Sequence, residues 1–446
     1  MSMVEEIRNK KWMAIIVFLA IDILQILLVS VITLDESTPL IIGLDLSKND
    51  PIISASLFIG IGVFQLIMLY YVSLNMLGSS MMREIYPKHD ETKPWHCRYS
   101  RDELVKWSSE IADQSNVKLD RIFVMQSPIP NAFTFSLPFI GSVLVIFSNL
   151  TDLLDVVEVK AIIAHEIGHI RNRDSLVSIF SQMPSFFIDI IYLYIYLRIG
   201  LGIATALVVS LDVAVAGLRL LVLLAFFIVS RVVVAIAKIL IQTSSRKAEL
   251  LADYHAATTI GTTSTINALI RLGQRVEAIT ALTETIRWLE SLNPERVHPI
   301  TQTELGRMLL AYPLDGIDEK NAEAMAPWVF LYTKLKHLRD VYGVSLSDEQ
   351  IIEAITPAAD TLSEKRSSKD SEKKEGTPPQ VIDWRIADTN GDSRLSNDEL
   401  LELITMLRNN PQKLMFDSEV GSNVLMLDHP DFRRRVLFLA DNCELK

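Results

Sequence analysis

Two long stretches almost without charge, both near the N-terminus, limit this chain more than any other feature. Residues 12–34 form a run of 23 with a single charge, Asp22, and residues 52–77 form a run of 26 with none. As helices, both are long enough to cross about 30 Å of hydrocarbon. The first is too long for a signal-peptide core and lacks a small-residue cleavage site. We therefore expect two retained transmembrane helices.

A third apolar zone covers residues 176–242, and its length fits two further spans, roughly 178–205 and 213–240. This zone also contains several charges, so the alternative is a pair of helices buried in a soluble domain or partly re-entrant. Asp22 and Asp189 are candidates for a polar path through the membrane. We favour the simpler interpretation, in which they pair within the helix bundle.

Lys and Arg near the spans predict the orientation. Basic residues flank the first two spans on their outer sides, whereas the loop between them contains only Lys48. The N-terminus and residues 78–178 should therefore be cytoplasmic, and two further spans return the C-terminus to the same side. The free cysteines Cys97 and Cys443 suit this reducing compartment.

Charge and cysteine content exclude several classes. Lys and Arg number 43 against 54 Asp and Glu, a net charge of −11, which argues against nucleic acid as a partner. Two cysteines exclude a disulfide framework and a cysteine-rich zinc module. Any metal site must therefore use His, Asp and Glu.

The soluble parts alternate between helical and strand-like patterns. We expect helices over 102–114, 152–173 and most of 244–288, strands over 121–125 and 142–147, and a disordered linker over 357–380. Three prolines, Pro128, Pro130 and Pro138, should confine the stretch between the two strands to a loop or a sheet edge.

The sharpest local signal is the segment 164–169, AHEIGH. On a helix, His165 and His169 share one face, so both imidazoles can bind one ion, and Glu166 can contact a water on that ion. An apolar run precedes the motif and predicts a buried helix, in which such a cluster without a metal would be costly. We interpret it as a zinc site.

A third ligand is needed, and Glu249 and Asp253 lie four residues apart in the helical segment RKAELLAD. Glu249 can bind the ion while Asp253 orients a ligand imidazole. An ordinary solvated helix face is the alternative, but the neighbouring leucines indicate burial.

The segments HEIGHIRNRD and SRKAELLAD, the apolar pair between them and the upstream PNAF at 130–133 resemble the HtpX-like membrane zinc metallopeptidases, relatives of the CAAX prenyl proteases. The order of these elements is similar over roughly residues 1–260. The resemblance implies one Zn²⁺ held by His165, His169 and Glu249, with Glu166 as general base. It also implies a cytoplasmic active site that cleaves membrane proteins. Asn131 and Ala132 are then candidates for binding an extended substrate.

Relatives in that family carry a later His-Pro-x-x-x-x-Arg segment near the active site, and two segments here are similar to it. His298 is followed by Glu304 where Arg is expected, whereas His429 is followed by Arg435 at the right offset. We prefer His429 and Arg435 as substrate-binding residues, which makes roughly 300–425 an insertion.

That insertion contains a second motif. Residues 388–399, DTNGDSRLSNDE, fit a twelve-residue EF-hand calcium loop. Its expected ligands are Asp388, Asn390, Asp392, the Arg394 carbonyl, Ser396 and Glu399. Ser393 replaces the glycine expected at position 6, and the only candidate partner loop, 342–350, lacks acidic ligands. An acidic capped turn is therefore the alternative to a calcium site.

Together these features predict a mainly α multi-pass membrane protein with a cytoplasmic α+β zincin-type domain and a small helical EF-hand-like module. The expected parts are 1–77 and 179–242 in the membrane, 78–178 and 243–300 in the catalytic domain, the insertion 301–425, and a C-terminal segment 426–446. The expected function is a zinc metalloendopeptidase of the cell membrane that cleaves membrane or misfolded proteins in quality control, with polypeptides and the lipid bilayer as partners. The alternatives are a CAAX-type prenyl protease and a calcium-responsive membrane adaptor with a structural metal site.

Overall fold

The computed structural model describes most of the catalytic region and the C-terminal module. The described residues are 70–79, 82–89, 97–125, 130–137, 139–175, 199–274, 382–416 without 383 and 393, and 431–445, besides isolated positions. The expected spans 12–34 and most of 52–77, the linker 357–380, the partner loop 342–350, and His298 and His429 lie outside them. The chain divides into two compact units. One contains residues 1–79, 136–140 and 172–251, and the other contains 80–135, 141–171 and 252–446.

Helix α3 (Arg101–Gln114) confirms the first predicted amphipathic helix. Ser100 caps it, because the Ser100 hydroxyl accepts from the Glu103 amide while the Glu103 carboxylate accepts from the Ser100 amide. Leu104, Trp107 and Ile111 are buried on one face, the spacing of an amphipathic helix. α3 packs through this face against α5.

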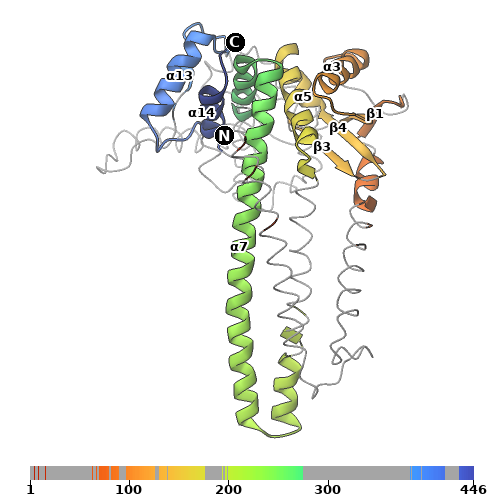
Figure 1. Ribbon diagram of the computed structural model, residues 1–446, viewed down its shortest axis with the longest axis vertical. Coiled ribbons are helices and arrows are strands. Elements are labelled where there is room, and N and C mark those ends of the chain that lie inside the picture. The colour runs from red at the N-terminus through yellow and green to blue at the C-terminus, as the bar shows by residue number, and fades with distance from the viewer. Residues whose placement is uncertain are drawn as a thin grey trace, which may run out of the picture. The chain divides into compact units, whose positions relative to one another are not determined.

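A four-stranded mixed sheet has the order β1-β2-β4-β3 (Figure 1). The strands are β1 (Met82–Tyr86), β2 (Arg121–Met125), β3 (Ala132–Leu137) and β4 (Gly141–Phe147). β1 and β2 are antiparallel, whereas β2 and β4 are parallel. The strands predicted at 121–125 and 142–147 are confirmed, and the proline-flanked β3 is an edge strand, as expected. β1 was not predicted, since MREIY directly follows an apolar helix and lacks clear alternation.

The single helix predicted over 152–173 is wrong at its start. The chain forms a short α4 (Ser148–Leu153) and then α5 (Val156–Arg171). Leu154 between them is extended, with φ −102° and ψ 148°. The Asp155 carboxylate accepts from the amides of Val157 and Glu158, and the Asp155 amide donates to Glu158. Asp155 therefore starts a new helix, which a charge pattern alone does not distinguish from a continuing one.

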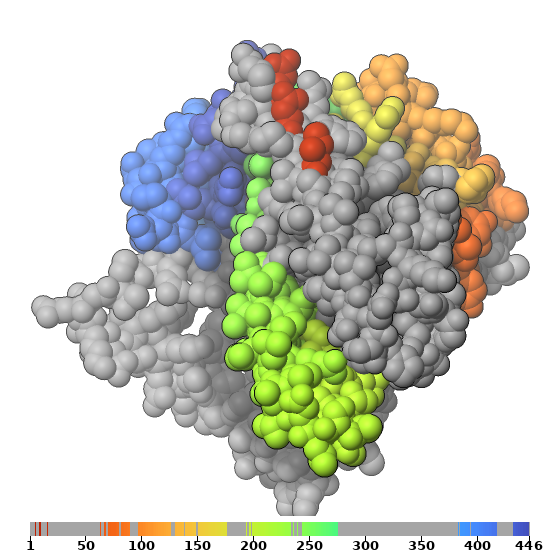
Figure 2. All heavy atoms as spheres, turned by 60° about the horizontal axis from the view of Figure 1, so that its bottom comes forward, coloured from red at the N-terminus to blue at the C-terminus, as the bar shows by residue number. Residues whose placement is uncertain are grey.

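Helix α7 (Val213–Thr259) runs from the third apolar zone into the predicted third-ligand segment without a break. Its first part, Val213–Val232, is the one helix among the described residues that is long and apolar enough to cross a membrane. A shorter apolar helix, Ile199–Val208, precedes it. This shorter helix and α7 lie side by side (Figures 1 and 2), and Arg219 on α7 donates to the carbonyl of Gly202. The predicted span 213–240 thus contains a helix of suitable length, whereas most of the predicted span 178–205 lies outside the described residues.

The C-terminal module contains η2 (Trp384–Ile386), α13 (Asn397–Asn409) and α14 (Phe432–Asn442). α13 packs against α14. Phe416 is 1% exposed and lies so close to Gly273 that no side chain would fit at that position. The helical residues 262–274, which follow α7, therefore form the surface on which this module packs.

Candidate metal centre

Helices α5 and α7 approach each other closely at Gly168. A side-chain carbon there would lie 3.1 Å from Ala252 Cα and 3.2 Å from His255 Cβ. The glycine within the His-Glu-x-x-His motif therefore has a packing role, because only small residues let the two backbones meet. This contact brings the α7 residue Asp253 within reach of α5.

His165 and His169 lie one turn apart on α5 and turn towards each other. Their Nε2 atoms are 3.1 Å apart and their ring centroids 4.8 Å apart. Glu249, which is 6% exposed, completes a group in which one ligand atom from each residue lies within 4.8 Å of the others. The structure thus brings together the three side chains that were expected to bind the ion.

Asp253 is fully buried and joins this group to the C-terminal helix. Its Oδ1 lies 2.9 Å from His165 Nδ1, so the Nε2 atom of that ring is left for a ligand. Arg435 donates to both carboxylate oxygens of Asp253, at 2.7 and 2.6 Å. Burial alone would raise the pKa of Asp253, but the charge and hydrogen bonds of Arg435, together with His165, lower it to about 2. Asp253 is therefore a carboxylate at neutral pH.

Arg435 was expected to bind substrate, and the structure places it behind His165 rather than among the ligand atoms. It is buried on α14 and 182 residues away from Asp253 in sequence. The choice of the 429–435 segment over 298–304 gains support from this contact, although both histidines lie outside the described residues. α14 therefore contacts His165 indirectly, through Asp253.

Glu166 lies beside the edge strand of the sheet. The Thr134 hydroxyl on β3 is 3.1 Å from the Glu166 carbonyl oxygen and 3.3 Å from its Oε2. Glu166 is 7% exposed, so its carboxylate is largely shielded from bulk water. Thr134 was not singled out in the sequence. Its position directly after Phe133, at the end of the PNAF segment, is the one signal that pointed to it.

The candidate substrate-binding residues Asn131 and Ala132 lie at the start of β3. The Asn131 carbonyl accepts from the Phe147 amide on β4 at 3.0 Å. The Asn131 side chain accepts from the Ala132 amide at 2.9 Å. The Asn131 carbonyl is thus engaged in the sheet and the Ala132 amide in a local contact, and β3, which begins at Ala132, lies at the sheet edge.

A second buried histidine, His255, was also missed. Arg171 on α5 lies 3.1 Å from its Nδ1, Ser115 Oγ lies 2.9 Å from its Nε2, and the Ser115 hydroxyl donates to the Ile111 carbonyl. Burial and then the Arg171 charge lower the pKa of His255 to about 4. A neutral ring that accepts from Arg171 and donates to Ser115 fits these contacts. It ties together the C-terminal ends of α3, α5 and α7.

The EF-hand-like loop is held by contacts within itself. The side-chain oxygens of Asp388, Asn390 and Asp392 accept from the amides of Gly391, Asp392 and Arg394, at 2.8–2.9 Å. Asp392 and Asn390 are exposed. These are the predicted calcium ligands, and each of them accepts a hydrogen bond from the loop backbone.

Glu399 at the end of the loop has a similar role. One of its carboxylate oxygens accepts from the amide and hydroxyl of Thr389, and the other from those of Ser396. These hydrogen bonds, chiefly from Thr389, lower the pKa of Glu399 to about 2. Ser396 and Glu399 form the capping box of α13.

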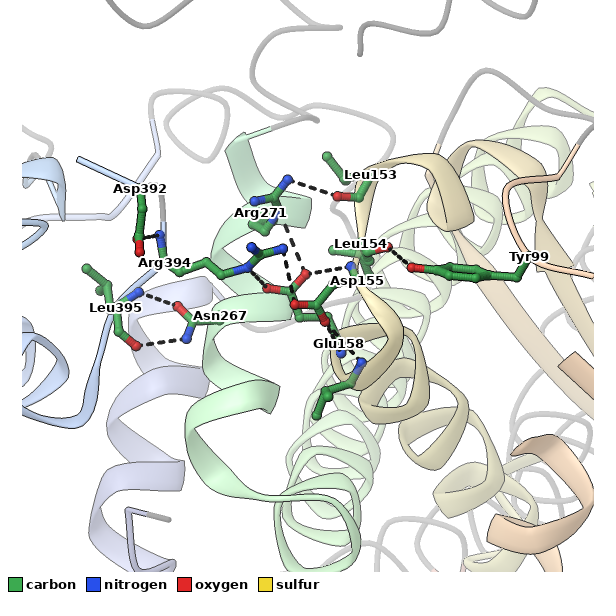
Figure 3. A network of polar contacts seen from close by, with 11 residues as sticks. Tyr99, Leu153, Leu154, Asp155, Glu158, Asn267, Arg271, Asp392, Arg394 and Leu395 are labelled. Atoms are coloured by element: carbon green, nitrogen blue, oxygen red, sulfur yellow. Dashed lines mark hydrogen bonds and ion pairs between the residues drawn. The ribbon is translucent and has the colours of Figure 1, made fainter. Parts of the chain in front are cut away.

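The middle of the loop contacts the start of the metal-ligand helix α5 (Figure 3). Arg394 lies 3.1 Å from the Asp155 carboxylate and 3.2 Å from Glu158, the two acids that cap α5. Leu395 is 1% exposed, and its backbone amide and carbonyl both bond to the side-chain amide of Asn267, at 2.8 and 2.9 Å. Asn267 therefore takes the pairing position that a second EF-hand loop would normally fill.

Chemically, the His165, His169 and Glu249 group suits zinc. Two imidazole nitrogens and one carboxylate oxygen are a donor set of catalytic zinc sites, which keep a further position for water or substrate. The carboxylate on His165 Nδ1 is the usual support for a metal-binding imidazole. A carboxylate next to this group, Glu166, supplies a general base. The arrangement can support hydrolysis of a carbonyl compound.

Comparison with known proteins agrees with this chemistry. Residues 100–307 match the model of Peptidase family M48. A protease HtpX homolog of Thermoplasma acidophilum is 27% identical over 148 residues, 27% of this chain and 46% of the relative. Protease HtpX homolog 1 of Saccharolobus solfataricus is 28% identical over 233 residues, 52% of this chain and 66% of the relative. The plastoglobule-localized metallopeptidase 48 of Arabidopsis thaliana is 36% identical over 62 residues, 14% of this chain and 18% of the relative.

The matches cover part of each protein. The chain spans about half to two thirds of the length of the two HtpX homologs. No solved structure matches the chain. The matched region contains α3, strands β2, β3 and β4, α5 and α7, whereas β1 precedes it, and it ends well before the EF-hand-like loop.

Proposed function

The chain is an HtpX-like metallopeptidase with a peptidase domain of family M48, and from this premise we propose that it is a zinc-dependent endopeptidase anchored in a membrane. The observation that carries the proposal is the group His165, His169 and Glu249, with Asp253 behind one imidazole. One zinc ion per chain would be held by these three residues. When bound, it would polarise the scissile carbonyl and acidify a water molecule.

The chain's own residues carry out the remaining steps of the reaction. Glu166 takes a proton from the attacking water and passes it to the leaving amine nitrogen. Asp253 and Arg435 keep the His165 ring in one orientation and in one tautomer. Thr134 holds the Glu166 carboxylate beside β3, so the base faces the sheet edge. An extended polypeptide can pair along that edge, which would place a peptide bond next to Glu166.

The decisive experiment compares wild type, Glu166→Gln and Glu110→Gln, a matched change at an exposed site on α3. Purified full-length protein is assayed for zinc content and for cleavage of an unfolded polypeptide. Glu166→Gln should keep zinc and lose nearly all activity, whereas Glu110→Gln should match wild type. His165→Ala and Glu249→Ala should lose both properties. Cleavage at the wild-type rate by Glu166→Gln would contradict the mechanism.

The same assay separates the alternatives. A prenylated CAAX peptide offered beside the unfolded polypeptide tests the prenyl-protease activity. A protein that binds zinc but cleaves neither substrate would instead be an adaptor with a structural metal. We expect the polypeptide to be the better substrate, in keeping with a role in membrane-protein or misfolded-protein quality control.

We propose four spans with both termini and the catalytic domain in the cytoplasm. The exposed apolar side chains of Val213–Val232, among them Leu218, Leu221 and Ile228, support a lipid-facing helix. A cysteine introduced at Lys48 should be labelled by an impermeant reagent added to intact cells, and Cys97 should not. The reverse pattern would overturn this orientation.

We further propose that residues 388–399 bind calcium at micromolar or weaker affinity. The ordered spacing of oxygen side chains supports this, while their hydrogen bonds to the backbone must be exchanged for the ion, which argues for weak binding. Calorimetry on full-length Glu166→Gln protein should show calcium heat that Asp388→Ala and Glu399→Gln reduce. Equal heats in all three, or no heat at millimolar calcium, would leave the loop as a capped turn.

A further inference from the structure

The turn between β3 and β4 presents a large aromatic side chain that packs against nothing. Phe139 is 98% exposed, although Leu137 and Ile140 beside it are buried. Its backbone has φ 72°, a left-handed conformation that a bulky L-residue rarely adopts. Glycine or asparagine would suit this position in water. The residue is thus unfavourable for a water-exposed turn in both its backbone and its side chain.

The turn is attached to the point where the chain enters its third apolar zone. The Ser136 amide donates to the Ser175 hydroxyl at 3.1 Å. Ser175 directly precedes Leu176, where the apolar stretch of 176–242 begins. Residues 136–140 also belong to the compact unit that contains the candidate span Val213–Val232. The turn is therefore part of the same unit as the expected membrane helices.

The chemistry around this point is that of a membrane–water boundary. Arg173, just before Ser175, is exposed. Basic side chains suit the cytoplasmic leaflet because its lipids carry negative charge. Aromatic rings are enriched at the level of the headgroups, where one side of the ring meets hydrocarbon. A single exposed Phe on a soluble surface would carry no information. Here, however, the turn that contains Phe139 is joined through Ser136 and Ser175 to a basic segment and to the start of an apolar one.

We propose that Phe139 inserts into the lipid headgroup region and anchors the end of edge strand β3 at the bilayer surface. This inference rests on the proposed membrane anchorage. Because Phe139 lies two residues after β3, its insertion fixes that end of the strand close to the lipid. Segments that emerge from the bilayer in an extended form could then pair with β3 without first diffusing into the aqueous phase. The partner of this surface is the lipid bilayer.

The test measures the environment of residue 139 directly. Full-length protein with Glu166→Gln, Cys97→Ser and Cys443→Ser is given a single cysteine, either Phe139→Cys or Leu401→Cys, and labelled with the fluorophore NBD. Leu401 is the matched control, because it is 53% exposed on α13 and belongs to the other compact unit, whose described residues contain no candidate span. The protein is reconstituted in vesicles of phosphatidylcholine and phosphatidylglycerol that contain nitroxide-labelled lipid.

At position 139 we expect a blue-shifted emission and several-fold quenching by nitroxides near the headgroup, whereas the label at 401 should respond as in water. Equal, water-like spectra at both positions would overturn the inference. If the labelled variants fail to fold, Phe139→Trp in vesicles of brominated lipid gives the same information, as additional tryptophan quenching relative to the parent. No additional quenching would also overturn it.

The proteolytic consequence is tested with active protein. Phe139→Ser should lower kcat/KM several-fold for a substrate tethered to the vesicle and leave cleavage of a soluble polypeptide unchanged, and Phe139→Leu should retain most of the tethered activity. Equal loss on both substrates would indicate a structural role instead. The fluorescence readout requires no catalysis, so its failure is distinct from failure of the proposed function. Protein that does not float with the vesicles would contradict the anchorage itself.

Discussion

The metal centre and the EF-hand-like loop both show metal-ligand patterns in the sequence, but they are built in opposite ways. At the candidate metal centre, His165 and Glu249 are buried and His169 is partly buried, and their supports come from far away, since Asp253 and Arg435 are 182 residues apart. In the loop, Asp388 and Asn390 contact backbone amides two or three residues away. The first geometry depends on residues far apart in the chain, whereas these loop contacts are local, although Arg394 and Leu395 also bond to distant residues.

The largest expected effect comes from breaking the remote support. Asp253→Ala leaves the buried guanidinium of Arg435 without its carboxylate and releases His165. Removing one partner of a buried ion pair costs about 3–5 kcal/mol, and losing such a support lowers metal affinity about 10- to 100-fold. We expect a large drop in the free energy of unfolding and weaker zinc binding, measured by denaturant unfolding and competition with a chelator.

Arg435→Ala should reproduce both effects. Arg434→Ala, at the exposed neighbouring position on α14, is the matched control and should change neither. Wild-type zinc affinity in Arg435→Ala would mean that α14 does not contribute to the metal centre.

A smaller effect is expected where the loop meets α5. Arg394→Ala removes the closest cation from Glu158, whose side chain is only 4% exposed, and leaves Arg271 at 3.9 Å. Because Arg394 is itself 43% exposed, we expect a loss of about 1–2 kcal/mol. Arg408→Ala breaks an exposed pair with Asp441 in the same module and should cost less than about 1 kcal/mol. Equal losses in thermal unfolding would show that docking on α5 adds nothing.

The two regions should also differ in their response to acid. The pKa of His255 falls from 6.5 to about 4 on folding, because the folded state favours the neutral ring. Its contribution to the free energy of unfolding is therefore complete above pH 6.5 and is lost as the pH falls towards 4. At pH 5 the loss in the free energy of unfolding is about 1 kcal/mol after allowance for solvent screening. His255→Gln keeps one donor and one acceptor and should remove this part of the pH dependence in metal-free protein.

By contrast, Glu399 in the loop has its pKa lowered from 4.5 to about 2, so its contribution changes only below pH 4.5. Glu399→Gln should therefore leave the stability profile between pH 5 and 6.5 unchanged. A change in that window for Glu399→Gln but not for His255→Gln would reverse the comparison.

The smallest effect separates the local fold of the loop from ion binding. Asp388→Asn keeps a side-chain oxygen for the Gly391 amide, whereas Asp388→Ala removes it. Without calcium, the Ala variant should lose about 0.5–1 kcal/mol and the Asn variant almost nothing. With calcium, both should lose the added thermal stability seen in wild type, because the charge has gone. A calcium response retained by both would place the ion elsewhere.

Regular local patterns predicted much of the fold. The capping box and apolar face of 102–114, the β-branched runs at 121–125 and 142–147, and the apolar stretch in α7 were recognisable because each depends on neighbours a few residues away. The break between α4 and α5 was missed, since Asp155 can cap a new helix or continue an old one. β1 was missed because its pairing partner, β2, is supplied by a distant part of the chain.

For the candidate site, the sequence identified the residue types and the structure shows which of them lie together. The spacing of His165 and His169 already implied a shared ion, and the motifs pointed to the family that residues 100–307 match. Arg435 was recognised as important but was expected to touch substrate. Only the packed helices show that it faces Asp253.

The sequence by itself determined the apolar part of α7, the His-Glu-x-x-His face and the local form of the EF-hand-like loop, because these depend on helical periodicity and on contacts within a few residues. Tertiary structure alone decided which distant residues support them. Gly168 lets α7 approach α5, Arg435 fixes Asp253, and Asn267 takes the place of a partner loop beside Leu395. Contacts of this kind join residues more than 80 positions apart. They form only in the folded chain, where a buried charge or backbone amide without a partner would cost free energy.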